Sequence, residues 1–256
     1  MPEGDAVRRT ARRLARALDG RVLTRTDFRV PRHATADLAG ATVLETVSRG
    51  KHLLTRTDRD VTLHTHLKME GTWRVFEPGK RWNPRAHEIR VVLETSGPTA
   101  VGYLLGIVEL VPTEREEDVV GHLGPDLLGP DWDEEEALRR LRAAPDEPVF
   151  EALRDQTRLA GVGTIYAAEA LFVMGVAPET PIGEVPDLPR LVRRVRQLLD
   201  QEWSRSNRMW VYRQRLCRRC GTQVRVDQLG PAGQERSAYW CPSCQPWPET
   251  GIRQRT

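Results

Sequence analysis

Two short segments, Cys217-Arg218-Arg219-Cys220 and Cys241-Pro242-Ser243-Cys244, contain all four cysteines of the chain. Each segment is a Cys-x-x-Cys knuckle, and a gap of 20 residues separates the two knuckles. Two such knuckles supply the four thiolates that tetrahedral Zn²⁺ prefers, and four protein ligands leave no open position for catalysis. The spacing therefore predicts one structural zinc ion per chain, held by Cys217, Cys220, Cys241 and Cys244. Two disulfides or unrelated free thiols are the alternative.

The predicted zinc hairpin lies in the basic part of the sequence. Arg and Lys outnumber Asp and Glu by 10 to 3 over residues 205–256, so residues 1–204 carry a net charge of −4. Localised positive charge suits contact with nucleic-acid phosphates. Four arginines lie within or beside the hairpin: Arg218, Arg219, Arg225 and Arg236. A solvated arginine-rich face is the alternative.

The N-terminal half is predicted to combine one helix with a β-sandwich. Residues 5–19 have the apolar spacing of an amphipathic helix, with Asp5 as its N-cap and Gly20 just after its end. Short alternating segments follow, separated by Gly, Pro, Asp and Asn, as is typical of an antiparallel sandwich. The predicted strands are 21–30, 41–48, 51–57, 61–67, 71–77, 87–95 and 99–111.

The second half is predicted to be helical up to the zinc hairpin. Residues 112–132 combine acidic residues with Gly and Pro and are predicted to be a linker. Helical spacing then indicates an all-α domain. The predicted helices are 133–143, 148–157, 164–174 and 188–204. The fold class is therefore α+β, with domains at 1–111, 133–211 and 212–256.

A glycine-rich turn, Leu159-Ala160-Gly161-Val162-Gly163-Thr164-Ile165-Tyr166, joins two of the predicted helices. Backbone amides at a helix N-terminus form an anion site, so a phosphate could bind there. A tight turn that only needs positive φ at glycine would have the same sequence.

The first residues, Met1-Pro2-Glu3-Gly4-Asp5, have their own chemistry. If Met1 is removed, Pro2 presents a secondary amine, which can condense with a sugar aldehyde carbon to form a cationic iminium. The neighbouring Glu3 carboxylate could transfer protons, and the predicted helix adds the positive end of its dipole. Retention of Met1 would block this amine, and a proline at position 2 is by itself usually accidental.

The chain resembles a known superfamily in these features and in further motifs that occur in order over nearly its whole length. The further motifs are Ser48-Arg49-Gly50-Lys51-His52-Leu53-Leu54, His64-Thr65-His66-Leu67-Lys68-Met69-Glu70-Gly71, Ala168-Glu169-Ala170-Leu171-Phe172 and residues 236–245. Together they resemble the formamidopyrimidine-DNA glycosylase/endonuclease VIII superfamily. MPEG followed by Asp, in place of MPELPE, is similar to the endonuclease VIII branch, and the whole most resembles its actinobacterial members.

The resemblance implies roles for three residues at the sugar. Pro2 would attack C1′ of a damaged nucleotide, Glu3 would transfer protons there, and Lys51 on a β-turn would reach the site and its phosphate. Lysine occurs only at positions 51, 68 and 80, whereas arginine occurs 36 times. This rarity indicates that Lys51 has a role that a compact ammonium fills and a planar guanidinium does not.

The resemblance also implies DNA-binding residues. Met69 would fill the gap left by a flipped base, although ordinary core packing is its alternative. Arg236 would bind the phosphates that flank the everted nucleotide. Gly161, Gly163 and Thr164 would form the phosphate turn of a helix-two-turns-helix domain over 133–211, ahead of a zinc finger over 212–256. Thr164 stands where the family has asparagine, so DNA affinity or lesion handling is expected to differ.

The implied function is a bifunctional DNA glycosylase and AP lyase of base excision repair. It would bind damaged double-stranded DNA in the cleft between its halves, excise bases, with oxidised pyrimidines the first expectation, and cut the strand by β- and δ-elimination. It would need no cofactor beyond structural zinc. The alternatives are a DNA-binding homologue that has lost activity, and an active enzyme retargeted to bulky or crosslinked adducts.

No apolar run approaches the roughly 20 residues that span a bilayer, so a cytoplasmic, nucleoid-associated bacterial monomer is expected. His64 and His66 alternate on one predicted strand face. A metal pair is one interpretation of them, but no third ligand is apparent nearby, so a structural role is predicted. Trp203 and Trp210 are predicted to pack against helices.

Overall fold

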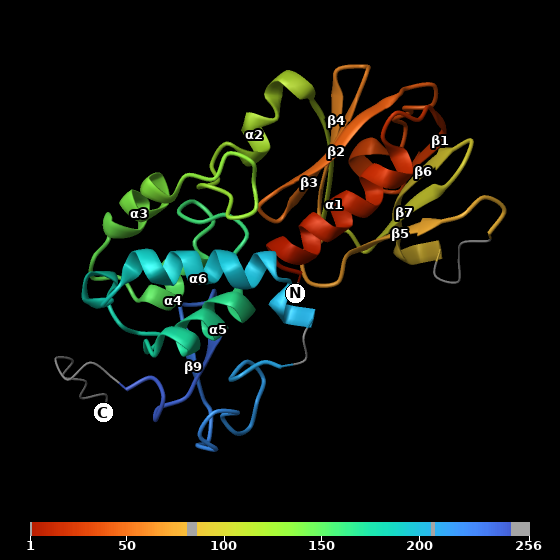
Figure 1. Cartoon of the computed structure of the whole chain (residues 1–256). Helices are drawn as coiled ribbons and strands as arrows, with labels where there is room; N and C mark the ends of the chain where they lie inside the picture. Colours follow the sequence, from red (N-terminus) through yellow and green to blue (C-terminus); the bar gives the residue numbers. More distant parts are fainter. Residues whose placement is uncertain (1, 81–85, 206–207, 247–256) are drawn as a thin grey trace. The chain divides into compact units, whose positions relative to one another are not determined.

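The computed structural model describes residues 2–80, 86–205 and 208–246, and the chain divides into two compact units, 1–122 and 123–256 (Figure 1). The unit boundary falls inside the segment 112–132, which the sequence predicts as a linker. The further division of the second unit at residue 212 stays a prediction. Two parts of the sequence-based predictions lie outside the described residues. They are Met1, whose removal would free the Pro2 amine, and residues 247–256, which end the predicted zinc finger.

The first unit is a helix packed with an antiparallel β-sandwich, as predicted. Helix α1 covers Gly4–Leu18. One sheet has the order β1-β6-β7-β5 and the other β2-β3-β4-β8. The strands are β1 (Leu23–Phe28), β2 (Val43–Arg49), β3 (His52–Thr57), β4 (Val61–His66), β5 (Thr72–Phe76), β6 (Ile89–Thr95), β7 (Thr99–Tyr103) and β8 (Ile107–Pro112). A short helix, α2 (Glu117–Val120), follows them.

One apolar core joins α1 to both sheets of this unit. Leu14 of α1, Val91 of β6 and Leu63 of β4 belong to the same buried cluster. Strand alternation sends Leu63 and Thr65 of β4 to this core, while His64 and His66 lie on the opposite face of their sheet. That opposite face also carries Leu54, Ile107 and Glu109, and it is the face that matters for the site below.

Two local predictions in this unit are wrong. The N-cap of α1 is Glu3 and not Asp5, which lies buried in the first turn, 3.9 Å from Arg9. An acidic residue in the first turn is favoured by the helix dipole, so the helix can begin one residue earlier. The predicted strand 99–111 is two strands, because Leu104 adopts φ +48 where the chain passes from one sheet to the other.

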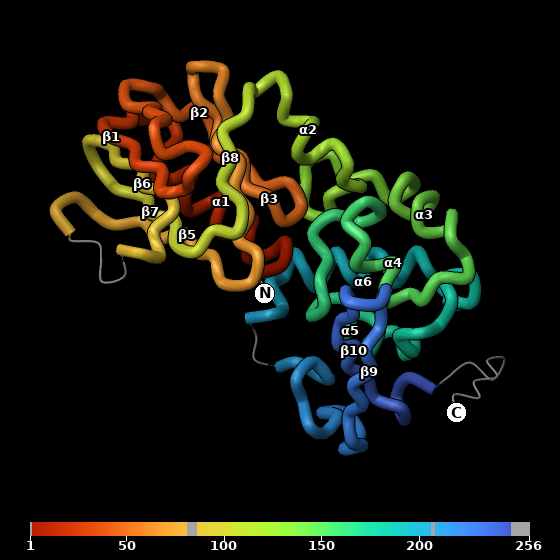
Figure 2. The backbone as a smooth tube through the Cα atoms, turned by 180° about the vertical axis from the view of Figure 1, so that it is seen from behind, coloured from red at the N-terminus to blue at the C-terminus, as the bar shows by residue number. Residues whose placement is uncertain are grey.

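Over the residues that the structure describes, the second unit contains four α-helices and a β-hairpin around one core. The helices are α3 (Glu134–Arg142), α4 (Val149–Arg154), α5 (Thr164–Met174) and α6 (Leu188–Asp200), and the hairpin strands are β9 (Arg225–Leu229) and β10 (Arg236–Trp240). Helix α5 has its predicted bounds and ends at Gly175, with φ +69. Figure 2 shows the hairpin beside α5. Cys217 and Cys241 belong to the same buried cluster as the helices.

Two predicted helices in this unit end early. Helix α4 stops at Arg154 because the Asp155 carboxylate accepts hydrogen bonds from the backbone N–H and the hydroxyl of Thr157, which turns the chain. Helix α6 stops at Asp200, and a separate 3-10 turn, Trp203–Arg205, follows. No helix of the described residues is both long enough and apolar enough to cross a membrane.

Candidate functional site

The start of α1 lies at the same end of the first unit as the β2–β3 turn. The Gly20 N–H donates to the Val43 carbonyl at 2.8 Å, so the helix ends where β2 begins. Helix α1 packs on β2, and its 15 residues span about 22 Å. The 7 residues of β2 span about 23 Å, so the two elements match in length. The start of α1, next to Pro2 and Glu3, is thereby brought to the sheet end where β2 turns into β3.

Glu3 combines burial with the positive end of a helix. Only 2% of its surface is exposed, and its carbonyl accepts the first helical hydrogen bond, from the Val7 N–H at 3.0 Å. Pro2, beside it, is half-buried. A carboxylate at a helix N-terminus could exchange protons with a group bound nearby.

Lys51 lies in a two-residue hairpin turn. Arg49 and His52 form the last pair between β2 and β3, which leaves Gly50 and Lys51 as the loop. Gly50 has φ +57, a left-handed conformation that this tight turn requires and that glycine adopts without strain. Lys51 therefore lies at the tip of a tight hairpin whose turn has only two residues.

Met69 lies in the next loop at the same sheet end. His52 pairs with His66, so the loop that follows β4 emerges beside the Lys51 turn. This loop closes through the Gly71 N–H, which donates to the Leu67 carbonyl at 2.9 Å. The Met69 side chain is 66% exposed, which is incompatible with ordinary core packing.

A row of histidines crosses the face of this sheet opposite the apolar core. His52 Nδ1 lies 2.8 Å from His64 Nε2, and His64 Nδ1 lies 3.0 Å from a carboxylate oxygen of Glu109 on β8. The His66 ring packs edge-on against His52, and its Nδ1 accepts from the Lys68 backbone N–H at 2.8 Å. From the sequence, only His64 and His66 are predicted to share a strand face. His52 and Glu109 join them because the register places both on the same face of adjoining strands.

These imidazoles are held in the neutral form. Burial, followed by the neighbouring His66, His64, His122 and Lys68, lowers the pKa of His52 to about 3. Burial, with Lys68 and Lys51, lowers the pKa of His66 to about 4. Burial also lowers the pKa of His64, an effect that Glu109 opposes. Among the described residues, the four cysteines are the only group of His, Cys, Asp and Glu with the geometry of a metal site.

In the second unit, the glycine-rich turn is stabilised from inside by Gln156. Its amide nitrogen donates to the Val162 carbonyl at 2.9 Å, and its carbonyl oxygen accepts from the Gly161 N–H at 3.1 Å. Gly161 has φ +102, so it requires glycine. Gly163 is the N-cap of α5, and Thr164 is the half-buried first residue of that helix.

Glu169 on α5 organises the chain that leads to the knuckles. Its fully buried carboxylate accepts from three consecutive backbone N–H groups, those of Trp210, Val211 and Tyr212, at 2.9 to 3.0 Å. Trp203 stacks on Trp210, and Trp210 on Phe172 of α5. The two tryptophans therefore pack against the helical core as expected, although neither lies in an α-helix.

The four cysteines converge to a metal-binding geometry. Their sulfur atoms all lie within 4.8 Å of one another, with 3.9 Å between Cys217 and Cys244 and 3.5 Å between Cys220 and Cys241. Four thiolates around a tetrahedral zinc ion are separated by about 3.8 Å, given Zn–S bonds of about 2.3 Å. All four are free thiols, so they are not paired in disulfides. This cluster could bind a metal ion.

Arg236 begins β10 and is exposed. It shares a cavity of about 380 Å³ with acidic residues of the α4 region. The cavity is lined by Glu147, Glu151, Arg154, Asp155, Gly230, Pro231, Gln234 and Arg236. Burial, followed by the charge of Glu147, raises the pKa of Glu151. The guanidinium donates to the carbonyls of Gln234 and Glu235, which holds it near the hairpin tip.

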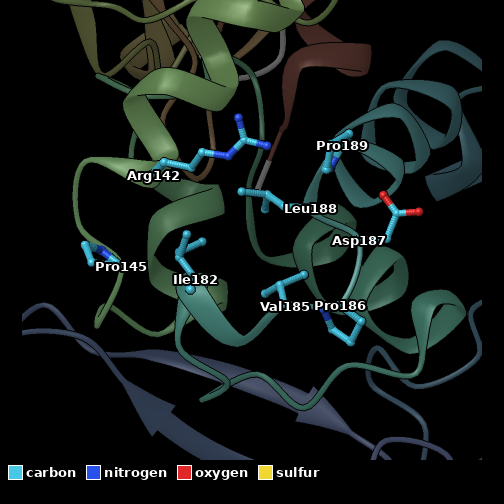
Figure 3. Close-up of a pocket in the computed structure, with 9 residues that line it drawn as sticks. Arg142, Pro145, Ile182, Val185, Pro186, Asp187, Leu188 and Pro189 are labelled. Atoms are coloured by element: carbon cyan, nitrogen blue, oxygen red, sulfur yellow. The ribbon is translucent and has the colours of Figure 1, made fainter.

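A second cavity, of about 420 Å³, lies beside the start of α6 (Figure 3). Its lining comprises Arg142, Pro145, Ile182, Gly183, Val185, Pro186, Asp187, Leu188 and Pro189. Asp187 caps α6 by accepting from the Arg190 N–H. None of the residues that the sequence predicts for a site lies in this cavity, so it is separate from the candidate site.

Comparisons with known proteins find relatives over the whole length of the chain. The model of the formamidopyrimidine-DNA glycosylase N-terminal domain matches residues 1–104. The probable endonuclease 8 2 of Streptomyces coelicolor is 50% identical over 275 residues, covering 100% of both chains. The DNA-(apurinic or apyrimidinic site) lyase Nei2 of Mycolicibacterium smegmatis is 46% identical, covering 96% of this chain and 99% of that protein.

A solved structure shows the same fold. The formamidopyrimidine-DNA glycosylase of Lactococcus lactis, non-covalently bound to DNA that contains an AP site, matches with a TM-score of 0.81. The match covers 96% of this chain and 100% of that chain, at 22% identity. The agreement therefore extends over both units of the chain, each with its own fold.

Proposed function

The chain belongs to the family of formamidopyrimidine-DNA glycosylases and endonuclease 8, and on this premise we propose that it is a bifunctional DNA glycosylase and AP lyase of base excision repair. Its substrate is damaged double-stranded DNA. Oxidised pyrimidines are the proposed lesions, and this choice rests solely on the resemblance of the sequence to the endonuclease VIII branch.

One observation carries the proposal for the chemistry. The start of α1, with Pro2 and the buried Glu3, lies at the sheet end where the Lys51 turn and the Met69 loop also emerge. An amine, a carboxylate, an ammonium and an exposed apolar side chain are thus gathered within one unit. These are the groups that imine formation beside a flipped nucleotide requires.

The reaction proceeds through a covalent intermediate. The Pro2 nitrogen, freed by removal of Met1, attacks C1′ as the bond from C1′ to the damaged base breaks, and the departing base takes up a proton. The sugar ring then opens: the C1′–O4′ bond breaks, O4′ takes up the proton that the Pro2 nitrogen loses, and an iminium forms between Pro2 and C1′. The iminium withdraws electrons, so that the C2′ proton can be lost while the C3′–O bond breaks and the phosphate leaves. A second elimination removes the C4′ proton and breaks the C5′–O bond. Glu3 holds and transfers protons at the sugar, and the Lys51 ammonium neutralises charge at the phosphate.

The remaining predicted residues hold the DNA. Met69 occupies the space that the everted nucleotide leaves, which offsets lost stacking. Arg236 and the turn of Gly161, Gly163 and Thr164 bind phosphates. Because Gln156 accepts the Gly161 N–H, that glycine acts by shaping the turn, and the N–H groups at the start of α5 are the ones that face a phosphate.

Zinc is the proposed metal of the cysteine cluster. Four thiolate donors in a hairpin select zinc, and four protein ligands make its role structural. When bound, zinc would stabilise the hairpin that carries Arg236. No step of the reaction involves it.

Borohydride trapping on a duplex with an abasic site tests the proposal. Protein whose terminal Pro2 has been verified by mass spectrometry should form a covalent adduct, because the reductant captures the iminium. The matched control retains Met1 or carries an N-terminal tag, and it should form none. Full trapping of the blocked protein would exclude Pro2 as the nucleophile. Absence of an adduct with free Pro2, with DNA binding intact, would support the DNA-binding homologue that lacks lyase activity.

A further inference from the structure

A chain of three side chains crosses the sheet beside the Lys51 turn. His52 lies on β3, His64 on β4 and Glu109 on β8, and each contacts the next at 2.8 Å and 3.0 Å. This row of hydrogen-bonded side chains connects His52, which follows Lys51, to strands β4 and β8. His64, at its centre, is 2% exposed.

The contacts determine the tautomer of each imidazole. A carboxylate oxygen of Glu109 can only accept, so His64 carries its proton on Nδ1. In a neutral ring, His64 Nε2 is then an acceptor, and His52 must donate to it from its own Nδ1. His52 is thereby fixed as the Nδ1-protonated form, and Glu109 acts on it through His64.

A hydrogen-bonded row of polar side chains is unusual at these partly buried sheet positions. A buried polar group destabilises the fold unless its partners satisfy it, and an apolar side chain would fill the same face at less cost. Arg32 lies 3.9 Å from the other Glu109 oxygen, and His66 and His122 lie edge-on to His52, so polar and charged groups flank both ends of the row. The buried Leu54 pairs with His64 at its centre. Because the pKa values of His52 and His64 are lowered, both residues are poor proton acceptors near pH 7, which favours a role in holding geometry.

We infer that the Glu109–His64–His52 chain is a positioning device for Lys51, which holds the Gly50–Lys51 turn in the place that the lyase reaction needs. The inference rests on the proposed function for the role of Lys51. Its structural basis is that the turn has only two residues, and the first residue after Lys51 is the one that the chain anchors. His52, His64 and Glu109 are positioning residues, and none of them needs to touch DNA.

Single-turnover cleavage of an abasic duplex by the full-length protein with free Pro2 tests this inference. His52→Leu and His64→Leu should each slow cleavage about tenfold, because a small displacement of a catalytic group reduces the rate strongly. Affinity for the duplex should stay within about twofold. His52→Asn should recover most of the rate, since its amide nitrogen can replace Nδ1 as the donor to His64. The matched control is His87→Leu, a histidine whose side chain is 84% exposed.

A double-mutant cycle separates positioning from general destabilisation. On a Lys51→Ala background, His52→Leu should cause no further loss, because the chain acts through Lys51. Hydrogen exchange measured by mass spectrometry should show faster exchange over residues 47–55 in His52→Leu and not in His52→Asn. A wild-type cleavage rate in His52→Leu, or an equal loss on both backgrounds, would overturn the inference.

The hydrogen-exchange measurement does not depend on activity. If the wild-type protein forms no adduct with borohydride, the proposed function fails. The inference about the Gly50–Lys51 turn is then tested by hydrogen exchange over residues 47–55. Unchanged exchange in His52→Leu overturns the inference, and locally faster exchange supports it.

Discussion

At the scale of single residues, Glu3 places an almost fully buried carboxylate at the start of α1. Glu3→Gln keeps the size of the side chain and removes its ionisable proton. Base excision in a single turnover should fall by about 10² or more, while DNA binding persists. Glu94→Gln makes the same change at an ion pair on β6 and should have no effect. Equal excision by the Glu3 variant would remove this residue from the mechanism.

The resemblance identifies Thr164 as a departure from the family pattern. An asparagine amide reaches further than a threonine hydroxyl and offers two donors, so a phosphate placed for asparagine would be too far from Thr164 for a direct bond unless water intervened. Thr164→Asn should tighten binding to lesion-containing duplex by about 1 kcal/mol, or about fivefold. Damaged and abasic duplexes should gain equally, because a phosphate contact does not distinguish bases.

Titration of both proteins against both duplexes at one salt concentration measures this effect. Looser binding by the Thr164 variant would show that threonine is adapted to its site. That result would favour the enzyme retargeted to bulky or crosslinked adducts over the one that excises oxidised pyrimidines.

At the scale of elements, the cysteine hairpin is joined to the helices. Gln245, which is fully buried, accepts from the Cys241 N–H and donates to the Val176 carbonyl just after α5. Arg219, between the first two cysteines, lies over the Phe172 ring at 4.4 Å. Loss of the metal should therefore destabilise the helices as well as the hairpin.

Metal removal tests this connection. The wild-type protein should contain one zinc ion per chain, and Cys241→Ser should lose it, because metal binding and folding of the hairpin are one equilibrium. The thermal midpoint of the second unit should fall by about 10 °C or more. Ser243→Ala, in the same knuckle but not a predicted ligand, should retain both zinc and midpoint. Absence of zinc from the wild-type protein would contradict the assignment.

Elements with a strong local signal were predictable from the sequence. Helix α5 has its predicted bounds because Gly163 and Gly175 flank it, and the cysteine spacing identified the metal cluster. Features that depend on strand register were not predictable. Neither His52 nor Glu109 has a local signal, and they meet His64 only because β3 and β8 pair with β4 in this register. The Gln156 bond to Gly161 likewise depends on the fold of the turn.

At the scale of the whole molecule, charge is divided unequally along the chain. Residues 205–256 hold 10 basic and 3 acidic residues, while residues 1–204 carry a net charge of −4. Counterion release from DNA should therefore come mainly from the C-terminal part. Most of the charge proposed to bind phosphates thus lies outside the N-terminal residues that would carry the lesion chemistry, so substitutions can separate the two.

Arg236 provides the test of this division. Arg236→Ala should weaken binding to all duplex sequences alike, because a phosphate contact carries no sequence information. The slope of log K against log salt concentration should become shallower by about one unit, as one phosphate contact is lost. Arg193→Ala makes the same change in net charge at an arginine paired with Glu134, and it should leave the slope unchanged. If the slope changes equally in both variants, the effect comes from total charge, and Arg236 does not contact a phosphate.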